Sequence, residues 1–181
     1  MVDFGNVRLE GMSASDLQRM YRFDLRINPD NGLETPFMLP ADVILNTRRA
    51  FSISTTSPTG YSDLGVPEGR YIAPPNSADC VQMKAGDCAP RTLLIRAPWF
   101  TRVDIGVTKR FTISGNTNFE LRADVLNVLD NTNFDPTVPV FSTTGAGAAA
   151  TIFQATAAYR DPNNTFDPGG RLGQLVFRLN W

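Results

Sequence analysis

The chain has 181 residues, with 17 Lys or Arg and 18 Asp or Glu, so its formal net charge is −1. A nearly neutral chain lacks the basic footprint of a nucleic-acid-binding protein, and we expect no nucleic-acid partner. Histidine is absent, which removes the usual general base and the commonest metal ligand. We therefore expect neither catalytic residues nor a cofactor or metal. No apolar run approaches the roughly 18 residues of a membrane-spanning helix.

The N-terminal half predicts one strand, within residues 1–10, followed by a long surface segment over residues 11–98. Three short elements are expected inside that segment: a helix that begins after Ser13, a hairpin of residues 21–27 with residues 34–39, and a helix from Pro40 to Ala50. Residues 60–75 are rich in Gly and Pro and predict irregular structure.

A second interpretation of residues 19–27 stays open, because their alternation also fits a membrane strand. Nine residues are about the minimum length for a tilted strand that crosses a bilayer.

The two cysteines, Cys80 and Cys88, are eight positions apart in a segment with prolines on both sides. This spacing suits a small disulfide-closed loop in an oxidising compartment. Two free thiols are the alternative, and two thiols without histidine make a poor zinc site. We expect a Cys80–Cys88 disulfide.

Residues 101–113 and 117–128 predict two long strands joined by a tight turn at residues 114–116. In both strands, apolar residues alternate with polar ones at the period of two that places them on opposite faces of a sheet. At about 3.3 Å per residue and a tilt near 45°, such strands span roughly 25 Å, the height of the apolar band of a membrane barrel.

Residues 129–170 predict a second long loop, with a short helix over residues 151–159. Asp161, Asn163, Thr165 and Asp167 have the alternate spacing of a calcium-binding loop. Phe166 stands where an EF-hand requires glycine, so that motif fails. An irregular ion site in the loops stays open.

The last strand, residues 171–181, ends the chain on an aromatic residue. A strand with one apolar face, one charged face and a final aromatic fits a barrel with lipid outside and water inside. The lipid-facing set is Val103, Ile105, Val107, Phe119, Leu121, Leu175 and Leu179. The lumen-facing set is Arg102, Asp104, Glu120, Arg122, Asp124 and Arg178. We expect residues 101–113 to pair antiparallel with 117–128, and 117–128 with 171–181.

Five stretches carry a family resemblance. FTRVDIGVTKRF (residues 100–111) and FELRADVLNVLDNTNF (residues 119–134) resemble the end of a TonB-dependent outer-membrane receptor. Residues 42–51, 65–74 and 169–181 resemble the subgroup of these receptors with a carboxypeptidase-regulatory-like N-terminal domain. The resemblance implies an all-β fold with short loop helices. The implied fold is a partial antiparallel sheet from the C-terminal end of a transmembrane β-barrel, with long extracellular loops.

The same resemblance implies a location in the bacterial outer membrane and a role in nutrient uptake. It also implies four partners: outer-membrane lipid, the remainder of the barrel, the barrel assembly machinery and the inner-membrane complex that supplies energy. Phe177 and Trp181 are, by resemblance, the aromatic anchor that the assembly machinery recognises.

Receptors of this family resemble 22-stranded barrels, and the N-terminus has no signal-peptide pattern. We therefore expect residues 1–181 to be a C-terminal fragment of the barrel domain, with a hairpin at 99–128, and not competent alone. The alternative from another class is a secreted soluble β-rich module for binding or adhesion, which would not depend on detergent.

Overall fold

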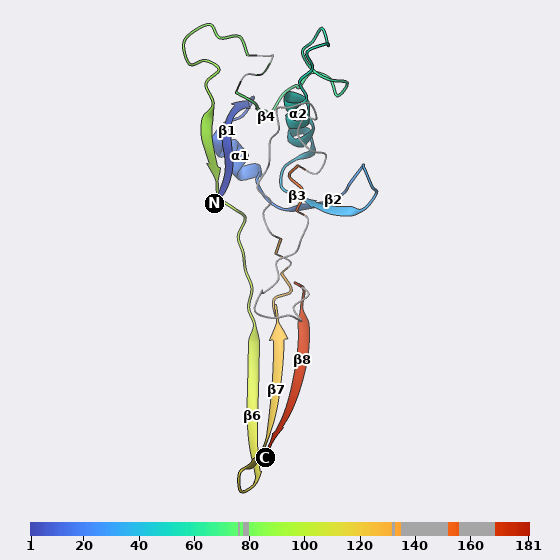
Figure 1. Cartoon of the computed structure of the whole chain (residues 1–181), viewed down its shortest axis with the longest axis vertical. Coiled ribbons are helices and arrows are strands. Elements are labelled where there is room, and N and C mark those ends of the chain that lie inside the picture. Colours follow the sequence, from blue (N-terminus) through green and yellow to red (C-terminus); the bar gives the residue numbers. More distant parts are fainter. Residues whose placement is uncertain (76, 78–79, 132, 135–151, 156–168) are drawn as a thin grey trace. The chain divides into compact units, whose positions relative to one another are not determined.

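The computed structural model describes residues 1–75, 77, 80–131, 133–134, 152–155 and 169–181. Within these residues the chain forms eight strands in antiparallel sheets and two short helices (Figure 1). Contacts divide it into two compact units. The first unit comprises Met1–Pro98 and Pro136–Thr156, and the second comprises Trp99–Asp135 and Ala157–Trp181.

The first unit is built on a three-stranded sheet. Its central strand β1 (Val2–Glu10) pairs with β4 (Tyr71–Ala73) and β5 (Arg91–Ile95). The register of β1 against β5 shifts between Asp3 and Asn6, where Gly5 has a φ of 70°. Glycine adopts this left-handed conformation without strain, and a bulge requires it.

Residues 60–75 are not wholly irregular, because β4 lies within them.

Three predicted elements of the first unit are confirmed. Helix α1 (Ala14–Met20) begins after Ser13, and helix α2 (Ala41–Phe51) begins after Pro40. The expected hairpin consists of β2 (Asp24–Ile27) paired with β3 (Glu34–Phe37).

The membrane-strand interpretation of residues 19–27 is wrong. Arg19 and Met20 belong to α1, and β2 has only four residues. A strand this short cannot cross a bilayer.

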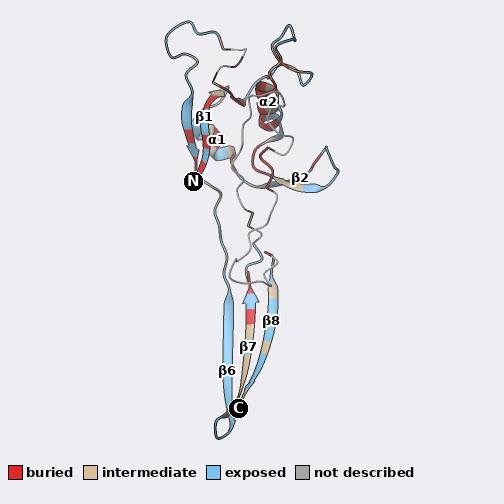
Figure 2. Ribbon diagram, viewed as in Figure 1, coloured by how far each residue is buried: buried red, intermediate tan, exposed pale blue. Residues whose placement is uncertain are grey.

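The first unit has a hydrophobic core of its own, and Figure 2 shows buried segments of β1 and α2 in red. Phe4 is 2% exposed, and the centroid of its ring lies 5.6 Å from that of Tyr21 and 5.8 Å from that of Phe153. Burial raises the pKa of the Tyr21 phenol above its usual range. Helix α2 is tied to the sheet because the Ile72 N–H donates to Thr47 Oγ1 at 3.1 Å. Residues 11–98 therefore form more than a surface segment: they bury a common core with β1.

Residues 152–155 add to the first unit beside β3. The Met38 N–H donates to the Phe153 carbonyl at 2.8 Å, and the Ala155 N–H donates to the Pro36 carbonyl at 2.9 Å. The helix expected over residues 151–159 lies mostly outside the described residues; the described part forms a turn and an isolated bridge.

Helix α1 carries a capping box that responds to acid. The Ser13 hydroxyl accepts from the Asp16 N–H, while the Ser13 N–H donates to Asp16 Oδ2 at 2.9 Å. The Ser13 hydroxyl also donates to Asp16 Oδ2 at 2.7 Å. This bond, then the Ser13 N–H bond and a further contribution from Arg19, lower the pKa of Asp16 from its usual 3.8 to about 2. A carboxyl with a depressed pKa stabilises the fold above its unfolded value, and that contribution is lost as the pH falls through about 2.

We expect Ser13→Ala to raise the pKa of Asp16 toward 3.8, because the hydroxyl bond is the largest cause of the shift. The substitution removes the hydroxyl half of the capping box, and the remaining bond from the backbone N–H of position 13 to the Asp16 carboxylate should be lost at a higher pH than in the wild type. Carboxyl titration by NMR measures this, with Ser54→Ala in a separate loop as the control. An unchanged Asp16 titration would contradict the role given to the cap.

The second unit is a three-stranded sheet in the order β6–β7–β8, formed by β6 (Ile105–Ser114), β7 (Thr117–Leu126) and β8 (Leu172–Asn180). Both predicted antiparallel pairings are confirmed. No described helix is long and apolar enough to span a membrane.

The strand β6 is shorter than expected, so Arg102, Val103 and Asp104 lie before it rather than on it. The physical reason is a local change of hydrogen bonding at the end of β7. Asn127 has a φ of 50°, and its N–H donates to Asp104 Oδ1 at 2.8 Å instead of to a strand carbonyl. The three residues therefore lie just before β6, at the end of the sheet where β7 ends.

Candidate functional site

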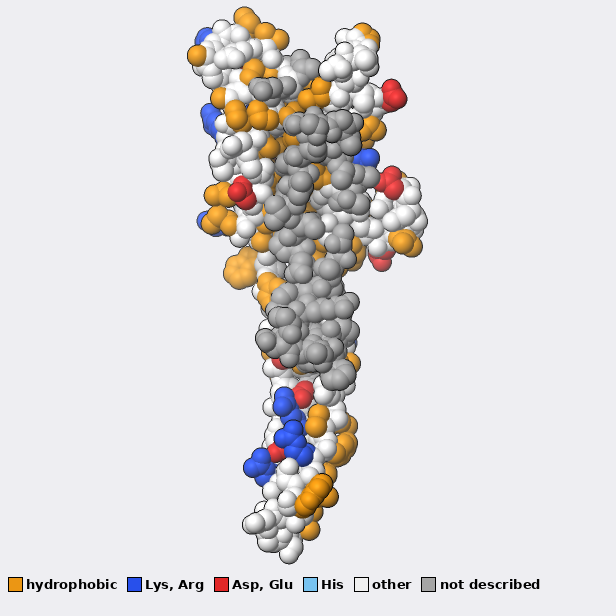
Figure 3. Space-filling view, viewed as in Figure 1, with side chains coloured by type: hydrophobic (Ala, Val, Ile, Leu, Met, Phe, Trp, Pro, Cys, Tyr) orange, Lys and Arg blue, Asp and Glu red, His pale blue; other side chains and the backbone are white. Residues whose placement is uncertain are grey.

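The sheet of the second unit has one face that is apolar except at Lys109. The register aligns three of its rows as Val107–Ala123–Leu175, Lys109–Leu121–Phe177 and Phe111–Phe119–Leu179. The rings of Phe111, Phe119 and Phe177 stack in sequence, each 6.2 Å from the next. Figure 3 shows apolar side chains along one side of this sheet and charged ones along the other. The separation of faces expected from the sequence is therefore present on the strands.

This apolar face is open to the surroundings rather than packed in a core. Leu175 is 65% exposed and Phe177 is 64% exposed. Contiguous exposed apolar surface of this kind marks an interaction with a membrane or a partner. Lys109 interrupts the face on β6, where its ammonium lies 5.8 Å from the Phe111 ring centroid.

The opposite face carries a ladder of alternating charges. Arg110 on β6, Glu120 on β7 and Arg178 on β8 form one row. The Arg110 Nη2 donates to Glu120 Oε2 at 2.6 Å, and Arg178 Nη1 lies 4.0 Å from Glu120 Oε1. A carboxylate between two guanidinium groups is stabilised in its charged form and holds the three strands in register.

A second ion pair lies on the same face, between Arg122 and Asp124. The Arg122 Nε donates to Asp124 Oδ1 at 2.9 Å. Gly106 on β6 faces this carboxylate, and a Cβ there would lie 2.8 Å from Asp124 Oδ1. The glycine therefore leaves room for the carboxylate to fold back against the strand. Glu120, Arg178, Arg122 and Asp124 line a polar hollow of about 570 Å³.

Sequence reasoning missed a polar cluster at the end of the sheet. The Asn127 side-chain amide donates to the Asn131 carbonyl, and Asn133 both donates to the Thr101 carbonyl and accepts from the Thr101 N–H. The turn-forming cluster after residue 129 was the available signal, since Asn and Asp stabilise turns through side-chain bonds. The hydrogen bonds of this cluster join the segment before β6 to the segment after β7.

The charged face suits the wall of an aqueous lumen more than a reaction centre. Its carboxylates are paired with guanidinium groups, and no group of three or more metal-binding side chains occurs among the described residues. The candidate calcium ligands Asp161, Asn163, Thr165 and Asp167 lie outside the described residues. The absence of catalytic, cofactor and metal sites stays a prediction.

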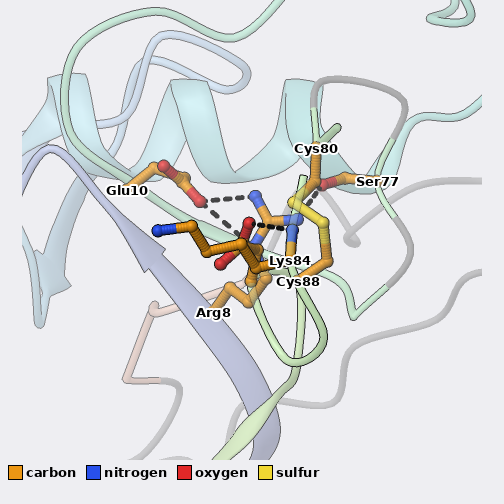
Figure 4. The surroundings of a disulfide bond; sticks show 7 residues. Arg8, Glu10, Ser77, Cys80, Lys84 and Cys88 are labelled. Carbon is orange, nitrogen blue, oxygen red and sulfur yellow. Dashed lines mark hydrogen bonds and ion pairs between the residues drawn. A yellow bond between two sulfur atoms is a disulfide. The ribbon is translucent and has the colours of Figure 1, made fainter. Parts of the chain in front are cut away.

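A disulfide joins Cys80 and Cys88, whose Cα atoms are 6.0 Å apart (Figure 4). The loop it closes is attached to β1 through Ser77, because the buried Arg8 donates to the Ser77 hydroxyl at 2.9 Å. Arg8 also forms an ion pair with Glu10. The bond therefore lies in the first unit, in the segment where the sequence places it.

We expect Cys80→Ala with Cys88→Ala to lower the free energy of unfolding by about 2.5 kcal/mol, the loop-closure entropy of so short a ring. Denaturant unfolding of the purified chain in detergent measures the loss. The parallel control is Ser54→Ala with Ser57→Ala, two partly exposed loop residues. Mass spectrometry of exported wild-type protein should find no free thiol, and two alkylatable cysteines would contradict the oxidised state.

Comparison with known families gives one match. The family model described as "Outer membrane beta barrel domain" matches residues 32–163. The match includes most of the first unit and both β6 and β7. No curated protein and no solved structure matches the chain significantly.

Proposed function

The chain belongs to the outer-membrane β-barrel domain family, and from this premise we propose that it is part of a TonB-dependent receptor that takes up a nutrient. Location in the bacterial outer membrane follows from the family. The finer assignment is supported by the receptor-like stretches at residues 100–111 and 119–134. Those stretches form β6, β7 and the polar cluster after β7.

The observation that carries the proposal is the two-faced sheet. Its apolar face is open, and its opposite face bears the paired charges of Arg110, Glu120 and Arg178. A barrel wall needs this combination, because lipid contacts the outer face and water contacts the inner one. We propose Ile105, Val107, Phe119, Leu121, Leu175 and Leu179 as lipid-facing and Glu120, Arg122, Asp124 and Arg178 as lumen-facing.

The remainder of the barrel is the proposed partner of this sheet. Among the described residues, β6 and β8 each pair on one side only. An unpaired strand edge in lipid leaves backbone groups without hydrogen bonds, so the sheet requires further strands to close. We therefore propose that the chain supplies part of the wall and does not transport alone.

The proposed role of the complete receptor is binding and passage rather than catalysis. The assembly machinery and the inner-membrane energy-coupling complex are its further proposed partners. The family match is to a membrane domain and favours the receptor over the secreted soluble module.

Uptake by the bacterium that encodes the chain tests the proposal. A strain lacking the gene should leave in the medium a nutrient that the wild type removes. Dissipating the proton-motive force of the wild type should have the same effect, because uptake by such receptors draws on the inner membrane. Removal that persists without the proton-motive force would indicate a passive barrel, and the protein in soluble fractions would overturn the membrane assignment.

A further inference from the structure

A hollow of about 400 Å³ lies in the first unit, between helix α2 and the β2–β3 hairpin, which are labelled in Figure 1. Ala41, Ile44, Leu45 and Arg48 supply the helical wall. Their spacing of three, four and seven residues places them on one face of α2. The ring of Phe37 and the side chain of Ile27 belong to the opposite wall. The hollow is mostly apolar and has the volume of a small-ligand site.

Two arginines line this apolar hollow, and each has a buried donor without a hydrogen bond. The Nε of Arg48 and the Nε of Arg26 both lack an acceptor. Asp24 Oδ2 lies 3.4 Å from Arg26 Nε, close enough for an ion pair but outside hydrogen-bonding geometry. Buried donors are nearly always satisfied in folded proteins, so two unsatisfied guanidinium donors in one hollow require an explanation.

Arg26 is held in place by contacts of the rest of its guanidinium group. Its Nη2 donates to the Leu39 carbonyl at 2.6 Å, and its guanidinium lies 4.5 Å from the Phe37 ring centroid. No hydrogen bond or ion pair of the Arg48 side chain occurs among the described residues. Arg26 is thus fixed in position, and the charge of Arg48 has no ion-pair partner among the described residues.

The acidic residue of the hollow does not neutralise it. Asp30 is exposed at the turn after β2, where its N–H donates to the side-chain oxygen of the buried Asn28 at 3.0 Å. Arg26 is paired with Asp24, so Arg48 is the arginine of the lining without an ion-pair partner among the described residues. An apolar cavity with an unpaired guanidinium in its wall favours an anion that also has an apolar body.

We propose that this hollow binds a small organic anion. Its carboxylate, sulfonate or phosphate group accepts from Arg26 and Arg48, and its apolar body lies against Ile44, Leu45 and Phe37. Binding here goes beyond the proposed uptake function and does not depend on it, since the site lies within the first unit alone.

The test uses the full chain in uncharged detergent, titrated calorimetrically with naphthalene-2-carboxylate as the probe, with binding to micelles alone subtracted. Naphthalene-2-carboxamide supplies the same body without charge, and inorganic phosphate supplies charge without the body. We expect the carboxylate to bind at least tenfold more tightly than either. Arg48→Gln should weaken carboxylate binding at least tenfold and leave carboxamide binding unchanged.

Arg22→Gln is the matched control, because it removes the same charge from an exposed position outside the hollow. Its carboxylate affinity should equal that of the wild type. Leu45→Glu is a second test in case the Arg48 variant does not fold, because Leu45 is a partly exposed residue of the helical wall. This variant should also abolish carboxylate binding. Equal affinities for carboxylate and carboxamide, equal losses in Arg22→Gln and Arg48→Gln, or no carboxylate binding would each overturn the proposal.

Discussion

Leu175→Arg is expected to prevent assembly of the protein in the outer membrane, whereas Val176→Arg, at the next residue of β8, is expected to be tolerated. Leu175 lies in the row with Ala123 and Val107, on the apolar face. Val176 lies in the row with Arg122 and Thr108, on the charged face. An arginine on the lipid side of a barrel costs about 2 to 4 kcal/mol near the bilayer midplane, while a lumen position is wet.

The pair forms a matched control, because the two variants introduce the same side chain one residue apart. Heat-modifiable folded protein in outer-membrane fractions measures assembly of the full-length protein. We expect the folded fraction to fall at least tenfold for Leu175→Arg and less than twofold for Val176→Arg. The reverse order would show that the two faces are assigned the wrong way round, and equal effects would remove the membrane interpretation of the sheet.

The sheet of the second unit was predictable because its signals are local. Alternation of period two separates the faces, and a tight turn at residues 114–116 fixes the pairing of β6 with β7. The strand ends were less predictable. A side-chain acceptor at Asp104 and the left-handed Asn127 interrupt the ladder, and neither changes the apolar pattern.

The elements of the first unit were also predictable, but their packing was not. Ser13 and Pro40 mark the starts of α1 and α2 by side-chain capping and fixed φ, which act within a few residues. In contrast, β1 pairs with strands about 65 and 90 positions away, and Phe4 contacts Phe153. No local pattern encodes such contacts, so the weak periodicity of residues 11–98 predicts a surface segment.

The hollow beside α2 shows the same difference between local patterns, which can be found in the sequence, and tertiary contacts, which cannot. The helical spacing of Ile44 and Arg48 can be found in the sequence, yet Arg26 joins them only through the β2–β3 hairpin. The unsatisfied state of the two Nε donors depends on the positions of every nearby acceptor. A ligand site of this kind follows from tertiary structure alone.

Trp181→Ala combined with Phe177→Ala is expected to lower the amount of folded full-length protein in the outer membrane severalfold. Phe177 stacks on Phe119 and is 64% exposed on the apolar face, and Trp181 is 90% exposed at the end of the chain. Aromatic residues at the membrane interface anchor barrel strands, and an aromatic pair contributes about 0.5 to 1.5 kcal/mol beyond its buried area. Losses of this size change the cellular abundance of a protein severalfold.

The control is Trp99→Ala with Phe100→Ala, which removes the same two side-chain types from residues outside the three strands of the sheet. Pulse-labelled protein should convert to the heat-modifiable form at the normal rate in this control and slowly in the terminal variant. A slow rate with a normal final yield would assign Phe177 and Trp181 to recognition by the assembly machinery. A normal rate with a reduced yield would assign them to anchoring in the bilayer. Normal rate and yield together would show that the terminal aromatics have neither role, and the apolar face alone would then account for membrane insertion.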